Sequence, residues 1–436
     1  MFHKPLWASW TPVPGVARRS MNTILGRSYR PIIAMNPLIS LRGSARLSTY
    51  KAALNHTSIR IARPAHLNPA ILLSRAVHTN NMSFQIPKTQ KAAVIVDKDA
   101  PIQVREDYPV IQPEQLAPGE CLVKLECTGV CHTDLHAAKD DWPLYAIRPL
   151  IGGHEGVGTI VAIAANTPRS PVKLGDRVGI KWLADACGNC EQCRKGLEQS
   201  CSKAKYSGFN TDGTFSQYVK SWVAHVTPIP ENLNSFEAAS ILCAGVTAYR
   251  AIKYCKLQSG DWIAIPGAGG GLGHLGVQYA KAQGLRVIAI DTGADKKELC
   301  LKLGADKWVD FKETKDIVKD IKDASGGLGP NAAIIVAANE SAYTQAVDYL
   351  RAGGTLALVG LPNSKLGASI FFTVFKSITI IGSFVGNRQD AIEAVDIAAM
   401  GLVKCHYAQK PLSALKEVYE GLAEGKVVGR VVLGME

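Results

Sequence analysis

Four cysteines lie within fifteen residues, and their spacing suits a metal ion. Such spacing lets one loop surround a tetrahedral ion, and four thiolates form the ligand set of closed zinc sites. An iron–sulfur cluster also takes cysteine, but its fourth ligand usually has a different spacing and a following proline. Because four protein ligands leave no position open, we predict a structural zinc that fixes a loop with little core of its own. The four ligands are Cys187, Cys190, Cys193 and Cys201.

A second group of metal-binding side chains is scattered along the chain. Taken singly, Cys243 in an apolar stretch and His154 in a loop read as ordinary core and loop residues, and spacing alone does not bring distant segments together. Two thiolates and one imidazole would leave zinc with an open fourth position, which can polarise an alcohol oxygen. Beside this open position, Thr133 offers a hydroxyl and His136 offers an imidazole, and the two could pass a proton outward. The segments concerned are 131–136, 152–156 and 242–245.

A glycine-rich turn follows an apolar strand at 262–265 and precedes a helical segment. Its spacing is GxxGxxG, through Gly267, Gly270 and Gly273, and glycine lets a pyrophosphate approach a helix N-terminus. The next strand ends at Asp291, whose carboxylate could hydrogen-bond the adenosine ribose and repel a 2′-phosphate. This pattern favours NAD over NADP. The alternative is a plain glycine-rich turn with a helix-capping aspartate.

Two kinds of element must position these residues. The first half of the chain beyond residue 82 has short alternating strands separated by Gly and Pro, typical of a β-rich barrel with long loops. From about residue 260, strands and helices alternate as in a doubly wound parallel sheet. The predicted class is α/β, with two domains. We expect a catalytic zinc domain over 83–241, completed by 385–436, and a dinucleotide-binding domain over 242–384.

The basic charge of the chain lies at its N-terminus. Residues 1–82 hold eleven Lys and Arg and no acid, so they account for almost all of the net charge of +12. Such acid-free, Arg- and Ser-rich composition is typical of an organelle transit peptide, which predicts the mitochondrial matrix. A disordered tail is the plain alternative. Another is that translation starts at Met82, which would leave a cytoplasmic enzyme.

The ordered motifs together resemble the zinc-containing medium-chain alcohol dehydrogenases, most closely the tetrameric NAD-dependent enzymes of yeasts and fungi. The resemblance runs from about Ile86 to the C-terminus and leaves the extension outside. It implies a GroES-like catalytic domain, a Rossmann cofactor domain, two zinc ions per chain and NAD. The matching motifs are GVCHTDLH (129–136), DWPL (141–144), GGHEG (152–156), GIKWL (179–183), LCAG (242–245), GSFVGNR (382–388), VVGR (427–430) and the four-cysteine loop.

The resemblance also implies a role for each matching residue. Catalytic zinc ligands would be Cys131, His154 and Cys243, with Asp134 orienting His154 and Glu155 lying behind the metal. Thr133 would hand the substrate proton through the nicotinamide ribose to His136, so both would touch the cofactor. Other cofactor contacts would be His132 and Arg430 at the pyrophosphate, Gly267, Gly270, Gly271, Leu272 and Gly273 along the turn, Asp291 and Lys296 at the adenosine ribose, Phe311 near the adenine, and Val359, Leu361, Ser383 and Val385 at the nicotinamide.

The implied substrate is a short primary alcohol such as ethanol, oxidised to its aldehyde or formed from it. Trp142 and Trp182 match large residues that narrow the pocket, although simple core packing is the alternative. Bulkier or aromatic alcohols are the runner-up, because Ala138-Lys139-Asp140 and the segment 145–148 depart from the family pattern. We expect a homotetramer with no nucleic-acid or membrane partner. A zinc-ribbon nucleic-acid module does not fit, since the basic residues lie outside the nearly neutral part that holds the cysteines. A third alternative is a protein of the same fold that has lost catalysis. Such a protein would be expected to lose some of the three catalytic zinc ligands, and all three are present in this chain.

Overall fold

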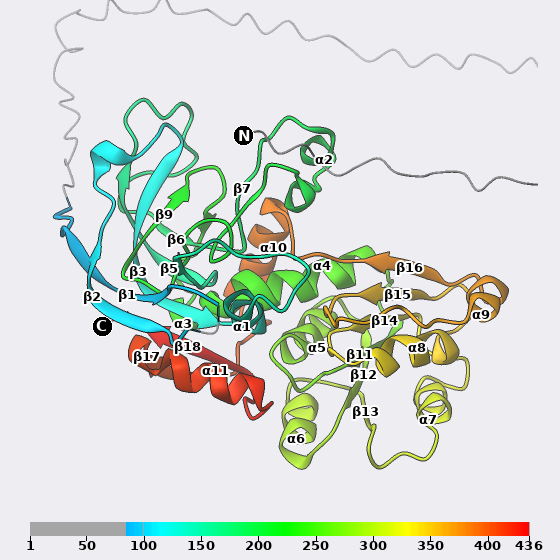
Figure 1. Cartoon of the computed structure of the whole chain (residues 1–436). Coiled ribbons are helices and arrows are strands. Elements are labelled where there is room, and N and C mark those ends of the chain that lie inside the picture. Colours follow the sequence, from blue (N-terminus) through cyan, green and yellow to red (C-terminus); the bar gives the residue numbers. More distant parts are fainter. Residues whose placement is uncertain (1–83, 99, 436) are drawn as a thin grey trace, which may run out of the picture. The chain divides into compact units, whose positions relative to one another are not determined.

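The computed structural model describes residues 84–98 and 100–435, so the predicted transit segment 1–82 lies outside the described residues. Within them, the chain forms a β-rich lobe and a parallel-sheet lobe (Figure 1), in agreement with the predicted class. In the described part of the chain, every helix is too short or too polar to cross a membrane.

The β-rich lobe contains a seven-stranded sheet with the order β10-β6-β5-β3-β18-β17, in which β9 also pairs with β3. The end of the chain therefore belongs to the same sheet as its beginning. Strand β18 runs antiparallel to β3 with Val431 opposite Val130, which brings Arg430 to the end of β3. Smaller sheets are β2-β1-β4 and β7-β8. The elements are β1 (Thr89–Ile95), β2 (Gln103–Pro109), η2 (Pro113–Gln115), β3 (Glu120–Val130), α1 (His132–Lys139), β4 (Leu150–Ile151), β5 (Gly156–Ile163), β6 (Arg177–Gly179), β7 (Leu183–Asp185), α2 (Glu191–Arg194), η3 (Glu198–Ser200), β8 (Lys205–Tyr206), β9 (Tyr218–Trp222), β10 (Thr227–Pro228), β17 (Tyr407–Pro411), η5 (Leu412–Ala414), α11 (Leu415–Ala423) and β18 (Arg430–Gly434).

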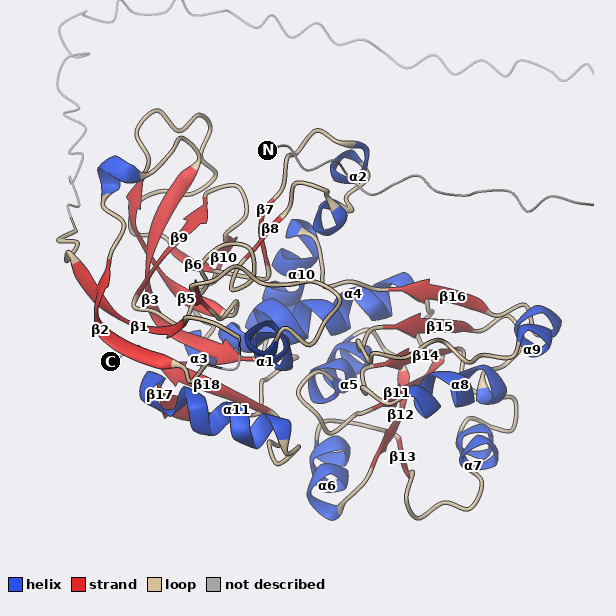
Figure 2. Cartoon of the chain, viewed as in Figure 1, coloured by secondary structure: helices blue, strands red, loops and turns tan. Residues whose placement is uncertain are grey.

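The second lobe is built on a six-stranded, all-parallel sheet with the order β13-β12-β11-β14-β15-β16. Helices lie between its successive strands (Figure 2), as expected for a doubly wound sheet. Four more helices, α3, η4, α4 and α10, connect it with the first lobe. The elements are α3 (Ser235–Ser240), η4 (Ile241–Gly245), α4 (Val246–Tyr254), β11 (Trp262–Pro266), α5 (Gly273–Ala282), β12 (Arg286–Asp291), α6 (Ala294–Lys302), β13 (Lys307–Asp310), α7 (Ile317–Ala324), β14 (Ala332–Ile335), α8 (Glu340–Tyr349), β15 (Thr355–Leu358), α9 (Ile370–Phe375), β16 (Thr379–Gly382) and α10 (Arg388–Ala399).

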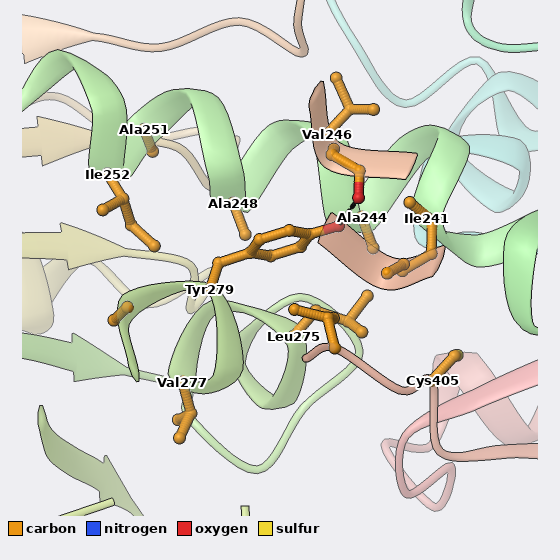
Figure 3. Packing of buried hydrophobic residues seen from close by; sticks show 14 of the residues in the cluster. Ile241, Ala244, Val246, Ala248, Ala251, Ile252, Leu275, Val277, Tyr279 and Cys405 are labelled. Carbon is orange, nitrogen blue, oxygen red and sulfur yellow. Dashed lines mark hydrogen bonds between the residues drawn. The ribbon is translucent and has the colours of Figure 1, made fainter. Parts of the chain in front are cut away.

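The parallel strands are apolar on both faces because helices cover both sides of the sheet. Along β11, Ile263 and Ile265 join the cluster that contains α4, α5 and α10, whereas Ala264 joins the cluster that contains α7 and α8. Tyr279 of α5 lies at the centre of the first cluster, between residues of α4 and the neighbouring turn (Figure 3). Its hydroxyl donates to the Ala394 carbonyl of α10 at 2.8 Å, and Arg250 of α4 pairs with Asp390 of α10, so these helices are held together by packing and by buried polar contacts.

Candidate active site

The four cysteines of the predicted structural site meet in one loop. Their Sγ atoms are 3.5 Å apart for Cys190 and Cys193, 3.6 Å for Cys187 and Cys201, 3.8 Å for Cys190 and Cys201, and 3.9 Å for Cys187 and Cys193. A tetrahedron with zinc–sulfur bonds of about 2.3 Å has edges of about 3.8 Å. Backbone N–H groups of Asn189 and Cys190 lower the pKa of Cys187 to about 6, which favours a thiolate. The donor set therefore fits a closed zinc site.

The second set of ligands comes from three separate elements. Cys131 directly follows β3 and is the N-cap of α1, His154 lies in the loop between β4 and β5, and Cys243 lies on the π-helical turn η4. A π-helical turn often marks a functional position, and here it inserts a residue between α3 and α4. The donor atoms of Cys131, His154, Glu155 and Cys243 all lie within 4.8 Å of one another, and all four residues are buried.

Asp134 holds two of these ligands at once. Its Oδ1 is 2.7 Å from His154 Nδ1, and both side chains are fully buried. Its Oδ2 accepts a hydrogen bond from the backbone N–H of Cys131 at 2.8 Å. A hydrogen bond at Nδ1 leaves Nε2 of His154, which lies 3.1 Å from Cys243 Sγ, as the nitrogen that can bind a metal ion. The Cys243 thiol donates to Cys131 and lowers the pKa of Cys131, so a thiolate is already favoured there. Two sulfurs and one imidazole nitrogen therefore fit a zinc ion with an open position.

Glu155 and Arg430 form a buried ion pair behind this cluster. One guanidinium nitrogen of Arg430 contacts Glu155 Oε1, and Arg430 Nε donates to Ser240 Oγ at 3.3 Å. The second oxygen, Glu155 Oε2, has no protein partner, although it is buried. Burial raises the pKa of Glu155. A buried carboxylate oxygen without a partner beside two thiols is consistent with a nearby cation.

The two predicted pocket tryptophans lie next to the zinc ligands. The Trp182 ring meets the His154 ring edge-on at a centroid distance of 5.1 Å, and the Trp142 ring meets Trp182 edge-on at 6.5 Å. Trp142 in turn stacks on His136 at 5.0 Å. Val385, expected at the nicotinamide, packs into the same cluster as both tryptophans. These rings form an apolar wall that extends from His154 to His136.

The glycine-rich turn has the close packing that its spacing predicts. A Cβ on Gly273 would lie 2.5 Å from the Cα atom of Ala268, so only glycine lets α5 begin against this turn. Gly267 has φ of +87°, a conformation that glycine adopts without strain. Gly271 faces Arg430, since a Cβ there would lie 3.0 Å from an Arg430 nitrogen. The turn, α5 and Arg430 therefore converge on one site, where a pyrophosphate can be bound.

Asp291 ends β12 and joins the glycine-rich turn to the following helix. Its Oδ2 accepts from the Gly269 N–H at 3.0 Å, and its Oδ1 lies 3.1 Å from Lys296 Nζ. A cavity of about 330 Å³ opens beside this strand, with Gly267 and Phe311 among its lining residues. Phe311, which is expected near the adenine, therefore lines a cavity next to the glycine-rich turn.

The other predicted cofactor residues lie on several elements of both lobes. Val359 is buried just after β15, Leu361 is exposed, and the Ser383 N–H donates to the Leu358 carbonyl at 2.9 Å. Leu272 is the N-cap of α5. The ring of His132 donates from Nε2 to the Leu422 carbonyl at 3.1 Å, which fixes it beside α11. Thr133 is half-buried on α1, one turn before His136.

Several residues around the site were not predicted from the sequence. His274 of α5 contacts the Gly270 carbonyl through Nδ1 at 3.0 Å and accepts the His406 N–H at Nε2, at 3.1 Å. His406 in turn accepts the N–H of Arg430 at its carbonyl, so His274 joins the glycine-rich turn to the Arg430 strand. Asp141 lies 2.7 Å from His136 Nδ1. The sequence signal for His274 was its place directly after Gly273. An imidazole in the first turn of this helix lies beside the glycine-rich loop that precedes it.

A β-rich lobe with one closed and one open metal site, joined to a nucleotide-binding parallel sheet, defines a metal- and dinucleotide-dependent oxidoreductase. The comparisons with known proteins agree. Residues 117–231 match the alcohol dehydrogenase GroES-like domain, and residues 271–400 match the zinc-binding dehydrogenase domain. The chain is 47% identical over 352 residues to an alcohol dehydrogenase of Schizosaccharomyces pombe, covering 80% of this chain and 99% of the relative. It is equally identical over the same length to alcohol dehydrogenase 1 of Neurospora crassa, covering 80% and 98%.

Solved structures give the same picture. An alcohol dehydrogenase of Aeropyrum pernix superposes with a TM-score of 0.71 at 32% identity, covering 79% of this chain and 99% of that one. Acetophenone reductase of Geotrichum candidum in complex with NAD has a TM-score of 0.71 at 28% identity, covering 80% and 98%. The chain belongs to the zinc-containing medium-chain alcohol dehydrogenases of fungal type and is a zinc-dependent alcohol dehydrogenase. These findings support the cofactors expected from the sequence, zinc and NAD.

Proposed function

We propose that the enzyme oxidises short primary alcohols to aldehydes with NAD and catalyses the reverse reaction. The observation that supports this best is the position of Trp182, whose ring lies 5.1 Å from that of the zinc ligand His154. With Trp142 behind it, this wall would narrow the space for a substrate beside the metal ligands. A narrow apolar space discriminates against long and branched chains more than against ethanol.

Zinc would supply a positive charge that lowers the pKa of the alcohol, and NAD would accept the hydride from its carbinol carbon. The residues of the chain hold and move the proton. Thr133 and His136 lie three residues apart on α1 and so share one face of that helix. In our proposal Thr133 would orient the substrate hydroxyl, and His136 would take up the proton that leaves it. The half-exposed ring of His136 can then release that proton to water.

Preference for NAD over NADP rests on Asp291. Its carboxylate ends β12 beside the glycine-rich turn, where an adenosine ribose would lie. A 2′-phosphate placed there would meet the fixed negative charge of Asp291. Lys296 pairs with Asp291 and offsets this charge only in part. We therefore expect a strong preference for NAD.

Initial rates of cofactor reduction across alcohols test this proposal directly. Short, long, branched and aromatic alcohols are compared, each with NAD and with NADP, in zinc-loaded enzyme. Ethanol with NAD should give the highest kcat/KM. A higher kcat/KM for benzyl or long-chain alcohols would assign the pocket to bulkier substrates, and equal rates with NADP would contradict the role of Asp291.

We also propose that the enzyme assembles with copies of itself, as a tetramer. The short helix α9 exposes five large apolar side chains beside β16, which pairs only with β15 among the described strands. An exposed sheet edge next to an apolar helix is a surface that a second copy can cover. The five residues are Ile370, Phe371, Phe372, Val374 and Phe375.

For location, we propose import into the mitochondrial matrix, based on the acid-free, basic composition of residues 1–82. The test is to tag the C-terminus, fractionate cells and sequence the N-terminus of the mature protein. A matrix form that begins after a basic residue, near Arg46 or Arg75, supports import. A solely cytosolic form beginning at Met82 or Ser83 would contradict it.

A further inference from the structure

The end of helix α1 is closed by a network that fixes the residues after it. Asp140 has φ of 48° and ψ of 41°, so the chain turns back on the helix at this position. Its Oδ1 accepts from the Ala146 N–H at 3.1 Å, and its Oδ2 pairs with Arg148 at 3.0 Å. Arg148 also donates to the Ala137 and Ala138 carbonyls at 2.8 and 3.2 Å. The loop 140–148 is therefore tied to the last turn of α1, and Asp141 is held in a defined place.

From that place the Asp141 side chain reaches His136. Asp141 Oδ1 lies 2.7 Å from His136 Nδ1, and Trp142 stacks on the imidazole at 5.0 Å with an interplanar angle of 25°. A carboxylate can only accept, so Nδ1 must carry a proton, and Nε2 is then the nitrogen that can accept a further proton. The ring is thus fixed in tautomer by Asp141 and in orientation by Trp142.

The backbone of Asp141 makes a second contact, with the other lobe. Asn363, two residues beyond Leu361 in the segment after β15, donates from Nδ2 to the Asp141 carbonyl at 2.9 Å. Asp141 belongs to the β-rich lobe and Asn363 to the parallel-sheet lobe, so this hydrogen bond joins the two lobes. One residue therefore contacts the proposed proton acceptor with its side chain and the cofactor lobe with its backbone.

We propose that Asp141 is a positioning residue that sets His136 for proton transfer, and that Asn363 keeps Asp141 in register with the cofactor lobe. The inference rests on the proposed role of His136. In each turnover the hydroxyl proton goes to His136 Nε2, the Asp141 carboxylate stabilises the resulting imidazolium, and the proton leaves to water from the partly exposed ring. No bond to Asp141 forms or breaks.

The experiment measures kcat and KM for ethanol oxidation from about pH 6 to about pH 9 in the zinc-loaded enzyme. Variants are Asp141→Ala, Asp141→Asn, Asn363→Ala, His136→Gln and the double variant of His136→Gln with Asp141→Ala. We expect Asp141→Ala to lose about tenfold in kcat/KM near neutral pH, with a smaller loss at high pH and partial rescue by added imidazole. Asp141→Asn, which keeps an acceptor oxygen without the charge, should lose less. Asn363→Ala should shift the profile in the same direction by a smaller factor.

The double variant separates positioning from a general structural effect. If Asp141 acts through His136, removing it from the His136→Gln enzyme causes no further loss. Additive losses, or an Asp141→Ala enzyme with the wild-type pH profile, would overturn the inference while leaving the role of His136 standing. A His136→Gln enzyme with wild-type profile would overturn the proposed proton acceptor and this inference with it. If Asn363→Ala changed only the KM for NAD, the role of Asn363 in positioning Asp141 would be overturned. Asp107→Ala, which removes an exposed carboxylate paired with Arg105 on β2, is the matched control.

Discussion

At the scale of single residues, the two metal sites differ in what holds their ligands in place. Every ligand of the four-cysteine loop comes from one short segment, so its ion would hold that loop together. The ligands of the open site are held by the protein itself, through Asp134 and through the buried turn that carries Cys243. Loss of a ligand should therefore have a different effect in each site.

We predict that Cys243→Ser abolishes alcohol oxidation and leaves one zinc per chain with little change in thermal stability. Cys190→Ser should also leave one zinc per chain, but it should lower the melting temperature and promote aggregation, since a structural zinc contributes folding free energy directly. Elemental analysis, thermal denaturation and activity of both variants provide the check. One zinc per chain in fully active wild-type enzyme would refute the assignment of two sites.

Asp291 gives a second prediction at this scale. Replacing it by Asn removes the charge but keeps an oxygen for the Gly269 N–H, and replacing it by Gly removes both. Either change should relax the preference for NAD over NADP by about tenfold or more, because repulsion of a 2′-phosphate is worth roughly 1–3 kcal/mol at such a site. The ratio of kcat/KM with the two cofactors measures this. A ratio that does not move would make Asp291 a turn residue only.

At the scale of elements, α5 links the glycine-rich turn to both lobes. Its first residue, Gly273, packs against Ala268 without room for a side chain, whereas Gly276 one turn later faces ordinary van der Waals contacts at 3.6 Å and beyond. Gln278 exchanges two hydrogen bonds with the backbone of Lys404, so the helix also holds the segment that leads into β17. The two glycines therefore form a matched pair for testing the packing of this helix.

We predict opposite effects for alanine at these two positions. Gly273→Ala should push α5 away from the turn and weaken NAD binding strongly, with a loss of stability of about 1–3 kcal/mol from overpacking. Gly276→Ala should bind NAD as the wild type does and gain up to about 1 kcal/mol, since alanine is favoured in a helix. Titration calorimetry and thermal melting distinguish the two. Equal effects at both positions would show that the close approach at Gly273 is unimportant.

His274 predicts a pH dependence of stability for the same helix. Burial lowers its pKa to about 4, with Arg430 and His406 also opposing protonation. The unfolded chain takes up this proton near pH 6.5, so the stabilisation is complete above that pH and is lost as the pH falls towards 4. The loss from this residue amounts to about 3 kcal/mol at most. His274→Gln keeps an acceptor for the His406 N–H and does not titrate, so its melting temperature should fall less between pH 7 and pH 5. An identical fall in both proteins would exclude His274 as the source.

Local sequence spacing is most informative where the cysteines or glycines concerned lie in one segment or follow a regular element. The four cysteines and the βα rhythm of the second lobe are of this kind, because local spacing largely determines their geometry. Contacts that depend on packing between the lobes were out of reach. The hydrogen bond from Asn363 to Asp141 needs the left-handed turn at Asp140 and the relative placement of two loops more than 200 residues apart, which no local pattern encodes.

At the scale of the whole molecule, the apolar side of α9 is the clearest apolar surface that the described residues 84–98 and 100–435 leave exposed. Phe371 and Phe375 stack on each other at 5.8 Å, one turn apart, and both are mostly exposed. Burying such a pair against another copy would remove much apolar surface from water. The assembly should therefore depend on these two rings.

We predict that replacing Phe371 and Phe375 by Glu together reduces the assembly from a tetramer to smaller species. Light scattering coupled to size-exclusion chromatography reports the mass, and the zinc content shows whether each chain stays folded. The exposed Leu328, at the end of the α7 segment, offers a control as Leu328→Glu, which should leave the mass unchanged. A tetramer that survives the double change would place its interfaces elsewhere.

The contrast between one contiguous and one scattered ligand set has a consequence for the order of maturation. A chain emerging from the ribosome, or threaded unfolded through a membrane channel, already has all four loop cysteines side by side once residue 201 has appeared. The other ion has to wait until β3, the loop before β5 and the turn η4 have been brought together by folding of both lobes. We therefore expect metal uptake in two steps, in which the loop captures its zinc early and a stable but inactive one-zinc protein precedes the working enzyme.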